Sequence, residues 1–155
     1  MGYAELLIIC IFVQLITPNM YPEYLVAPMR EELTKVGFKE LKTAAEVDDA
    51  IKSEGTALVV VNSVCGCAAA NARPGVRMAV NNAKKPDHLL TVFAGMEKDA
   101  VDQARAHMLP FPPSSPAIAL FKNGELVHMI ERHQIEGRSA ELIADNLAAA
   151  FQQYC

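Results

Sequence analysis

The sequence predicts an α/β domain whose central sheet is covered by helices on both faces. Two apolar runs without polar breaks, "ALVVV" at 57–61 and "LLTVF" at 89–93, lead to this prediction. Such runs are typical of strands buried on both faces, as in a parallel sheet. Helical patterns alternate with these strands, which is the order of elements in α/β folds. A hairpin signal near the C-terminus adds antiparallel strands, so the predicted sheet is mixed.

The segment before the first long strand begins with one helix and one short strand. Apolar residues recur at helical spacing over 28–36, with Pro28 in the first turn of the predicted helix and Gly37 just after its end. Residues 38–41 are a short extended segment. The chain is therefore expected to enter the sheet soon after Gly37.

A second helix is predicted just before the first apolar run. Thr43 and Glu46 have the spacing of a capping box, in which two side chains satisfy free backbone N–H groups at a helix start. Gly55 ends this helix, and the buried strand at 57–61 follows directly.

The middle of the chain continues the alternation. An alanine-rich helix is expected after Cys67, and Pro74 with Gly75 should kink it or delay its regular part. The buried strand at 89–93 comes next, followed by a helix over 97–109 with apolar residues on one face.

The C-terminal third predicts a hairpin and a last helix. A proline-rich loop at 111–116 leads into strands at 117–121 and 126–130, and Asn123-Gly124 lies between them as a tight turn. Ser139 is placed to cap the final helix. The antiparallel pair therefore comes last along the sheet.

Composition limits both the size and the class of the protein. The chain has 155 residues, of which 52% are hydrophobic and 21% charged, and its net charge is −4. These values indicate one folded domain over 20–155, and the scattered basic residues do not suggest a nucleic-acid partner. Residues 1–19 form an N-terminal extension; its apolar stretch is shorter than a bilayer span and lacks signal-peptide features, so no stable membrane association is expected. We interpret Met20 as the functional start.

Four cysteines, Cys10, Cys65, Cys67 and Cys155, are too few for a secreted disulfide scaffold of this length. A reducing cytoplasm is the compartment that fits this count. In that compartment a close cysteine pair is more often catalytic or metal-binding than structural.

The pair Cys65-Gly66-Cys67 follows a predicted strand and precedes a predicted helix. In open α/β sheets, ligands and chemistry gather at this edge, and free N–H groups of a helix start favour a thiolate. Cys65, nearer the tip, is expected to attack. A ring closed across one residue has few free torsions, so its disulfide should be easily reduced, and Gly66 offers the backbone freedom to close it.

Other interpretations of the pair compete with redox catalysis. A structural zinc site needs four ligands, and the histidines lie far away in sequence without a knuckle pattern, so no metal is expected. Two small core cysteines are the plainest alternative. A third is a redox sensor or interaction module that the pair switches without turnover.

Three stretches, "VVVNSVCGCAAANARPGV", "PSSPAIALFKNGELVHMIERHQIEG" and the terminal "AAAFQQYC", resemble the bacilliredoxin family over residues 20–155. The resemblance implies a thioredoxin-like fold and thiol–disulfide exchange. Family members remove bacillithiol, a low-molecular-weight thiol, from protein mixed disulfides, and some act as weak disulfide isomerases. Cys65 would then be the nucleophile and Cys67 the resolving or modulating thiol. The resemblance also implies a cis proline beside the pair, and Ser115-Pro116 fits that place.

The remaining predictions concern the partners, the cofactors and two further residues, Arg73 and Cys155. Proteins thiolated by bacillithiol or another small thiol are the expected partners, and no metal or organic cofactor is needed because electrons pass through the cysteines. Arg73 is a candidate to supply positive charge, although a solvated or salt-bridged surface position is the favoured interpretation. Cys155, at the mobile end of the chain, is a possible accessory thiol. The sequence leaves the number of chains in the assembly open.

Overall fold

The computed structural model describes residues 20–155; the predictions for residues 1–19, including Cys10, lie outside this range. The elements follow the expected alternation. In chain order they are α2 (Glu23–Thr34), β1 (Lys39–Glu40), α3 (Ala44–Ile51), β2 (Thr56–Asn62), η1 (Ala68–Ala72), α4 (Arg73–Ala79), β3 (His88–Phe93), α5 (Lys98–His107), β4 (Ala117–Lys122), β5 (Glu125–Ile130), α6 (Arg132–Ile135) and α7 (Ala140–Tyr154).

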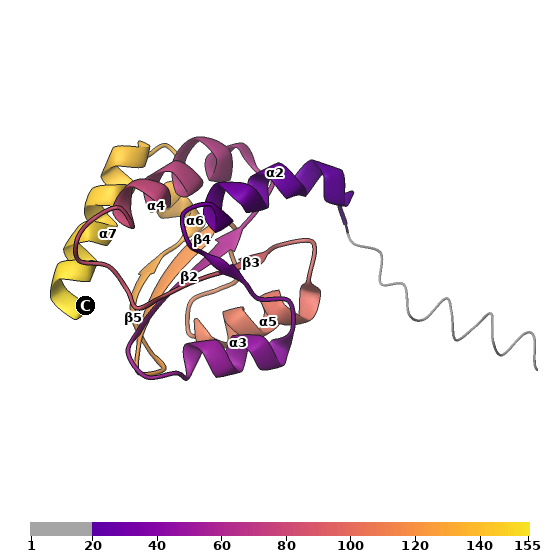
Figure 1. Cartoon of the computed structure of the whole chain (residues 1–155). Coiled ribbons are helices and arrows are strands. Elements are labelled where there is room, and N and C mark those ends of the chain that lie inside the picture. Colours follow the sequence, from indigo (N-terminus) through magenta and orange to yellow (C-terminus); the bar gives the residue numbers. More distant parts are fainter. Residues whose placement is uncertain (1–19) are drawn as a thin grey trace, which may run out of the picture.

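The five strands form one mixed sheet in the order β1-β3-β2-β4-β5. β1, β3 and β2 run parallel, whereas β4 is antiparallel to β2 and β5 is antiparallel to β4. This confirms the predicted parallel strands and the antiparallel hairpin. β2 lies at the centre of the sheet, so its C-terminal end is bordered by strands on both sides (Figure 1).

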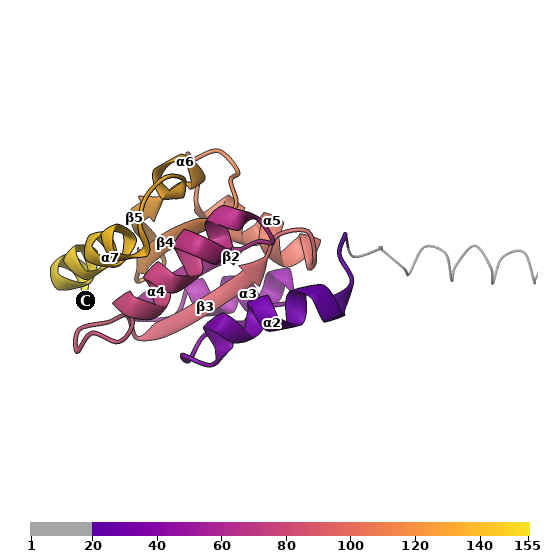
Figure 2. The ribbon, with the colours of Figure 1, turned by 90° about the horizontal axis from the view of Figure 1, so that it is seen from above.

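Side chains of β2 alternate between two apolar layers. Leu58 and Val60 pack in the layer formed with α4 and α7, and Val59 and Val61 pack in the layer formed with α3 and α5. Figure 1 shows the sheet between these two sets of helices, and Figure 2 shows α7, α4 and α2 side by side over one face. All seven residues of β2 are buried, as the apolar run predicts.

Several local predictions are confirmed at atomic detail. Asn123 and Gly124 both have positive φ angles, 49° and 83°, as a two-residue hairpin turn requires. The Ser139 hydroxyl accepts a hydrogen bond from the Leu142 N–H at 3.2 Å and caps α7. The helix after the cysteines is irregular over η1 and becomes a regular α-helix only at Arg73, which is the predicted delay.

The predicted start of the first helix is wrong. α2 begins at Glu23, and Pro28 lies inside it rather than in its first turn. Contacts on both sides of the proline compensate for its missing N–H: Val26 is buried in the core, and Arg30 pairs with carboxylates. A single proline therefore did not mark a boundary, because tertiary contacts stabilise the helix through it.

Two further differences concern helix starts. The Thr43 hydroxyl accepts from the Glu46 N–H, but the Glu46 carboxylate accepts from the Lys42 N–H, so only half of the predicted capping box forms. The short helix α6 was not predicted; its capping box between Glu131 and Gln134 was the available signal. Across residues 20–155, no helix is long and apolar enough to span a bilayer.

Candidate active site

The cysteine pair lies where the central strand gives way to a helix. β2 ends at Asn62, and helical geometry begins at Gly66, so Cys65 stands at the junction. The Cys65 carbonyl accepts from the N–H groups of Ala68 and Ala69 at 3.0 and 3.2 Å. Both cysteines are free thiols and half-buried, which excludes the alternative of two fully buried core cysteines.

The two thiols have shifted pKa values of opposite sign. Burial alone would raise the pKa of Cys65, but donors outweigh it and hold that pKa below its ordinary value. These donors are the Cys67 thiol, the Ser63 hydroxyl and the backbone N–H groups of Ala68 and Cys67. Burial, the hydrogen bond to Cys65 and the negative charge on Cys65 raise the pKa of Cys67. Of the two thiols, Cys65 therefore has the lower pKa, and its surroundings favour its thiolate over that of Cys67.

Arg132, on the unpredicted helix α6, is a cation whose charge acts on both thiols of the pair. Its charge favours the thiolate of Cys67, although the carboxylate of Glu136 acts against it. The guanidinium bonds Glu136 at 2.6 Å and donates to the Ser115 carbonyl at 3.2 Å. Figure 2 shows α6 near the start of the helix that follows the cysteines. Sequence reasoning missed Arg132 because α6 itself was missed.

The Ser115–Pro116 segment borders the cysteine loop. Ala117 pairs with Val61 across the β2–β4 ladder, so Pro116 lies beside Asn62 at the end of β2. Its peptide bond with Ser115 is cis, as the resemblance implies. Pro116 is buried and Ser115 is half-buried, so the loop forms one wall of the site.

Arg73 does not have the surface position that the sequence favoured. Its side chain is 2% exposed and pairs with Glu32 at 3.0 Å. The same guanidinium donates to the Asn62 side chain at 3.0 Å and to the Ser63 carbonyl at 2.8 Å. Arg73 therefore holds residues 62 and 63, the backbone segment that leads into the cysteines, from the buried side. The surface interpretation failed because it considered Arg73 alone. In the folded chain, the Glu32 carboxylate and the Ser63 carbonyl lie beside its guanidinium.

Gly66 shows no special backbone requirement in this dithiol form. Its φ lies outside the left-handed region, and a Cβ added to it would meet nothing within 4 Å. Glycine is therefore not required at this position in the dithiol form. That the closed Cys65–Cys67 disulfide ring requires it stays a prediction.

Cys155 lies at the opposite end of the sheet. Its thiol is near Thr56, the first residue of β2, and near Asp87, which directly precedes β3. The length of β2 separates this place from Cys65, about 20 Å at a strand rise of about 3.3 Å per residue. In this conformation Cys155 does not reach the pair within one chain. A role for it between chains stays a prediction.

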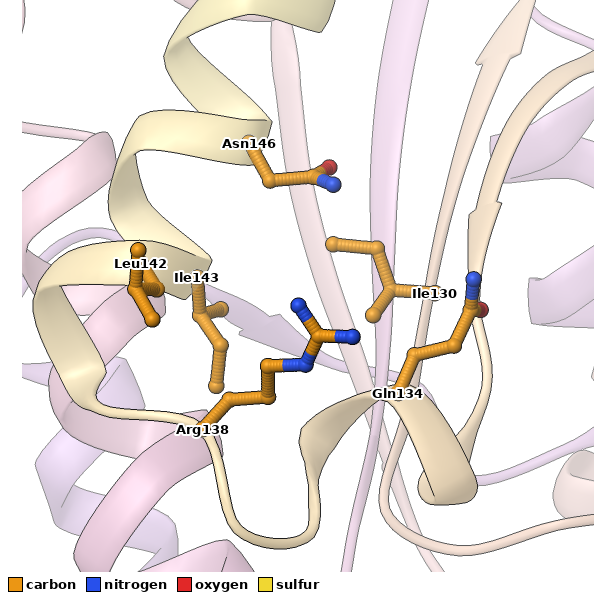
Figure 3. Close-up of a pocket in the computed structure, with 6 residues that line it drawn as sticks. All are labelled: Ile130, Gln134, Arg138, Leu142, Ile143 and Asn146. Carbon is orange, nitrogen blue, oxygen red and sulfur yellow. The ribbon is translucent and has the colours of Figure 1, made fainter.

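A cavity of about 290 Å³ opens beside Cys65 and is lined also by Ser63, Arg105, Ser115 and Arg132. A separate cavity of about 130 Å³ lies between α6 and α7. Figure 3 shows that the Arg138 guanidinium points into this second space, between Ile143 and Ile130, and no cysteine lines it. The chemistry of the pair therefore belongs to the first cavity.

Metal binding has little support in the part of the chain that the structure describes. Within residues 20–155, no three histidine, cysteine or acidic side chains are arranged so that they could hold a metal ion. A pair of thiolates alone gives half of a structural zinc site.

Comparison with known proteins gives consistent matches. A family model described as "Disulphide isomerase" matches residues 21–155. The chain is 58% identical over 134 residues to a bacilliredoxin of Cytophaga hutchinsonii, covering 86% of this chain and 99% of that protein. It is 54% identical to a bacilliredoxin of Koribacter versatilis (88% and 94% covered) and 53% identical to one of Halalkalibacterium halodurans (87% and 94%).

Solved structures support the same fold at low identity. Mitochondrial thioredoxin 3 of Saccharomyces cerevisiae superposes with a TM-score of 0.53 at 15% identity, covering 79% of this chain and 98% of that one. A thioredoxin of Malassezia sympodialis gives 0.51 at 15% identity, with 76% and 90% covered. The thioredoxin-like fold is thereby confirmed.

Proposed function

The chain belongs to the bacilliredoxin family of thiol–disulfide oxidoreductases, and on this premise we propose that it removes a low-molecular-weight thiol such as bacillithiol from mixed disulfides on protein cysteines. Cys65 is the nucleophile and Cys67 the resolving thiol. One observation supports this most strongly: at the mouth of a cavity, one thiol has a lowered pKa and its neighbour a raised one. Only a thiolate attacks a disulfide, so the pair has a defined order of action.

In the first step the Cys65 thiolate attacks the sulfur of the small thiol in the mixed disulfide. A new disulfide forms between Cys65 and the small thiol, and the old one breaks. The electron pair leaves on the sulfur of the substrate protein, which takes a proton from solvent. The donors around Cys65 hold its thiolate ready for this attack.

The second step follows from the same electrostatics. The negative charge on Cys65 raises the pKa of Cys67, and this charge disappears once Cys65 is in a disulfide. Cys67 then loses its proton more readily, with the positive charge of Arg132 nearby. Its thiolate attacks Cys65, closes the Cys65–Cys67 disulfide and releases the small thiol. Two external thiols then reduce this disulfide in two exchange steps and leave as a disulfide of their own, which returns the pair to the dithiol form.

Neighbouring residues have supporting roles in this proposal. The buried Arg73 positions the backbone before the pair. The loop at Ser115 and Pro116 offers backbone groups to an extended segment of the substrate protein, as the family resemblance implies. The reaction needs no bound cofactor, and S-thiolated proteins in a reducing cytoplasm are the partners that its chemistry requires.

Three cysteine variants test the proposal. We expect Cys65→Ser to abolish release of the small thiol from a bacillithiolated protein, and Cys67→Ser to trap it on Cys65 as a mass increment. Cys155→Ser is the matched control and should keep wild-type turnover. Release that continues in Cys65→Ser would contradict the assignment. A single turnover without recycling, in the presence of an external thiol, would favour a sensor instead.

A further inference from the structure

The cavity beside Cys65 contains a positive charge without an ionic partner. Arg105 comes from α5, on the other side of the sheet from α4, and lines the cavity together with Cys65. Within residues 20–155 it forms no salt bridge, and its Nε is buried with no hydrogen-bond partner. A buried donor without a partner is costly, and a functional role or a bound ion or water is among the explanations for one in a native protein.

Three other arginines near this part of the sheet are paired with carboxylates, and among the described arginines the buried, unbonded Nε belongs to Arg105. Arg30 bonds the carboxylates of Glu23, Glu40 and Glu97, and Arg73 bonds that of Glu32. Arg132 shares the cavity with Arg105 but is already paired with Glu136. Arg105 therefore supplies the unpaired positive charge of the cavity.

The surroundings of Arg105 also define which ligand fits. Asp102 lines an adjoining cavity with Arg105, but its carboxylate pairs with Lys98 instead. The space of about 290 Å³ equals that of about ten water molecules in the liquid. It admits the small thiol of a mixed disulfide, whereas a folded protein stays outside. A carboxylate on that small thiol would satisfy the Arg105 guanidinium with charge-assisted hydrogen bonds.

We propose that this cavity is the subsite for the carboxylate-bearing part of the small thiol, with Arg105 as its ion partner and Arg132 as a second, shared cation. This inference rests on the proposed function and adds a choice between two sulfurs. With the small thiol held in the cavity, its sulfur faces Cys65 and the sulfur of the substrate protein points outward. Attack then transfers the small thiol to Cys65, and the substrate protein leaves as a free thiolate.

A pair of matched substrates isolates the role of the carboxylate. One carrier protein is thiolated with 3-mercaptopropionate and, separately, with its neutral amide, and kcat/KM for thiol release is measured for each. We expect the full chain to prefer the carboxylate about tenfold, the range of one well-formed ion pair in a partly buried site. We expect Arg105→Gln to lower kcat/KM on the carboxylate substrate far more than on the amide, so that the preference falls to about one.

Two variants control the experiment. Arg105→Lys keeps the charge and should retain part of the preference, and Arg77→Gln removes a charge from an exposed position on α4 that lines neither cavity. Release of the amide by Arg105→Gln shows that this variant is folded. Equal loss on both substrates, or an undiminished preference in Arg105→Gln, would overturn the subsite. Failure of the wild-type protein on both substrates would instead refute the proposed function.

Discussion

Cys65 and Cys155 lie near opposite ends of the central strand β2. The more exposed residue, Cys155, has the raised pKa, and the half-buried Cys65 has the lowered one. Cys155 is exposed, yet partial desolvation of its sulfur and the nearby carboxylate of Asp87 raise its pKa. Cys65 is half-buried, yet its pKa is lowered. Exposure of the whole residue therefore does not decide which thiol has the lower pKa, because the Cys155 sulfur is itself partly desolvated. The groups that face each sulfur decide it.

The two sulfurs also meet opposite ends of helices. Cys65 precedes a helix, and the backbone N–H groups of Cys67 and Ala68 in its first turn favour the thiolate. Cys155 follows α7, where free carbonyl groups and the negative end of the helix dipole lie. Lys84 and Lys122 are close to this end, but they donate to the carbonyls of Gln152 and Tyr154. The thiol near the C-terminal end of β2 thus has a lowered pKa, and the thiol near its N-terminal end has a raised one.

Alkylation by iodoacetamide should show the largest effect. At pH 7 we expect Cys65 to react faster than Cys155 by about an order of magnitude, because more of it is thiolate even after the lower nucleophilicity of an acidic thiol is counted. Peptide mass mapping reports each cysteine separately. As pH falls, Cys65 should keep its reactivity to lower pH than a free thiol, because its pKa is lowered; Cys155 should gain reactivity only at higher pH.

Urea-unfolded protein is the reference for this comparison, since both thiols then have ordinary surroundings. The difference in rate should disappear there. Equal rates in the folded protein would mean that the donors around Cys65 do not stabilise its thiolate, and the contrast between the two ends would fail.

Replacing Ser63 by alanine should give a smaller effect at one end only. The variant removes a hydroxyl that donates to the Cys65 thiolate, while the backbone donors remain. We expect alkylation of Cys65 at pH 7 to slow about three- to tenfold, from the worth of a hydrogen bond to a charged group in a partly exposed site. Cys155 should be unaffected. Ser53→Ala, a serine whose hydroxyl donates to the Ala50 carbonyl at the end of α3, is the matched control and should change neither rate.

Sequence alone predicted the strand that separates the two thiols and the position of Cys65 directly after it. The apolar run at 57–61 located β2, and the cysteines directly after it located the reactive end. Such features are local, because a buried strand and a turn of Asn123-Gly124 are encoded by neighbouring residues. Pro28 was misleading for the opposite reason: contacts distant in sequence, such as those of Arg30 with Glu97, hold α2 together on both sides of it.

The charges of the site could not be predicted in the same way. Arg73, Arg105 and Arg132 lie on three different helices, and only the folded chain shows which of them is buried, unpaired or close to sulfur. The favoured surface interpretation of Arg73 failed for this reason. Ser63 was not singled out from the sequence either, although it stands within "NSVCGC", two residues before Cys65, where connectivity alone keeps its hydroxyl near the thiol.

Replacing Gly66 by alanine tests the partner thiol, the feature that Cys65 has in addition to its donors. The added methyl group meets no atom within 4 Å in the dithiol form, so the free energy of unfolding of the reduced protein should change by less than about 1 kcal/mol. The closed Cys65–Cys67 ring should lose stability by about 1 kcal/mol, a shift of about 20 mV toward easier reduction, because alanine narrows the backbone angles available for closure. Equilibration with glutathione buffers measures this shift, and alkylation of Cys65 should stay at the wild-type rate. An unchanged potential would show that ring closure does not use the freedom of glycine, and that the reactive end differs from the end at Cys155 through its donors alone.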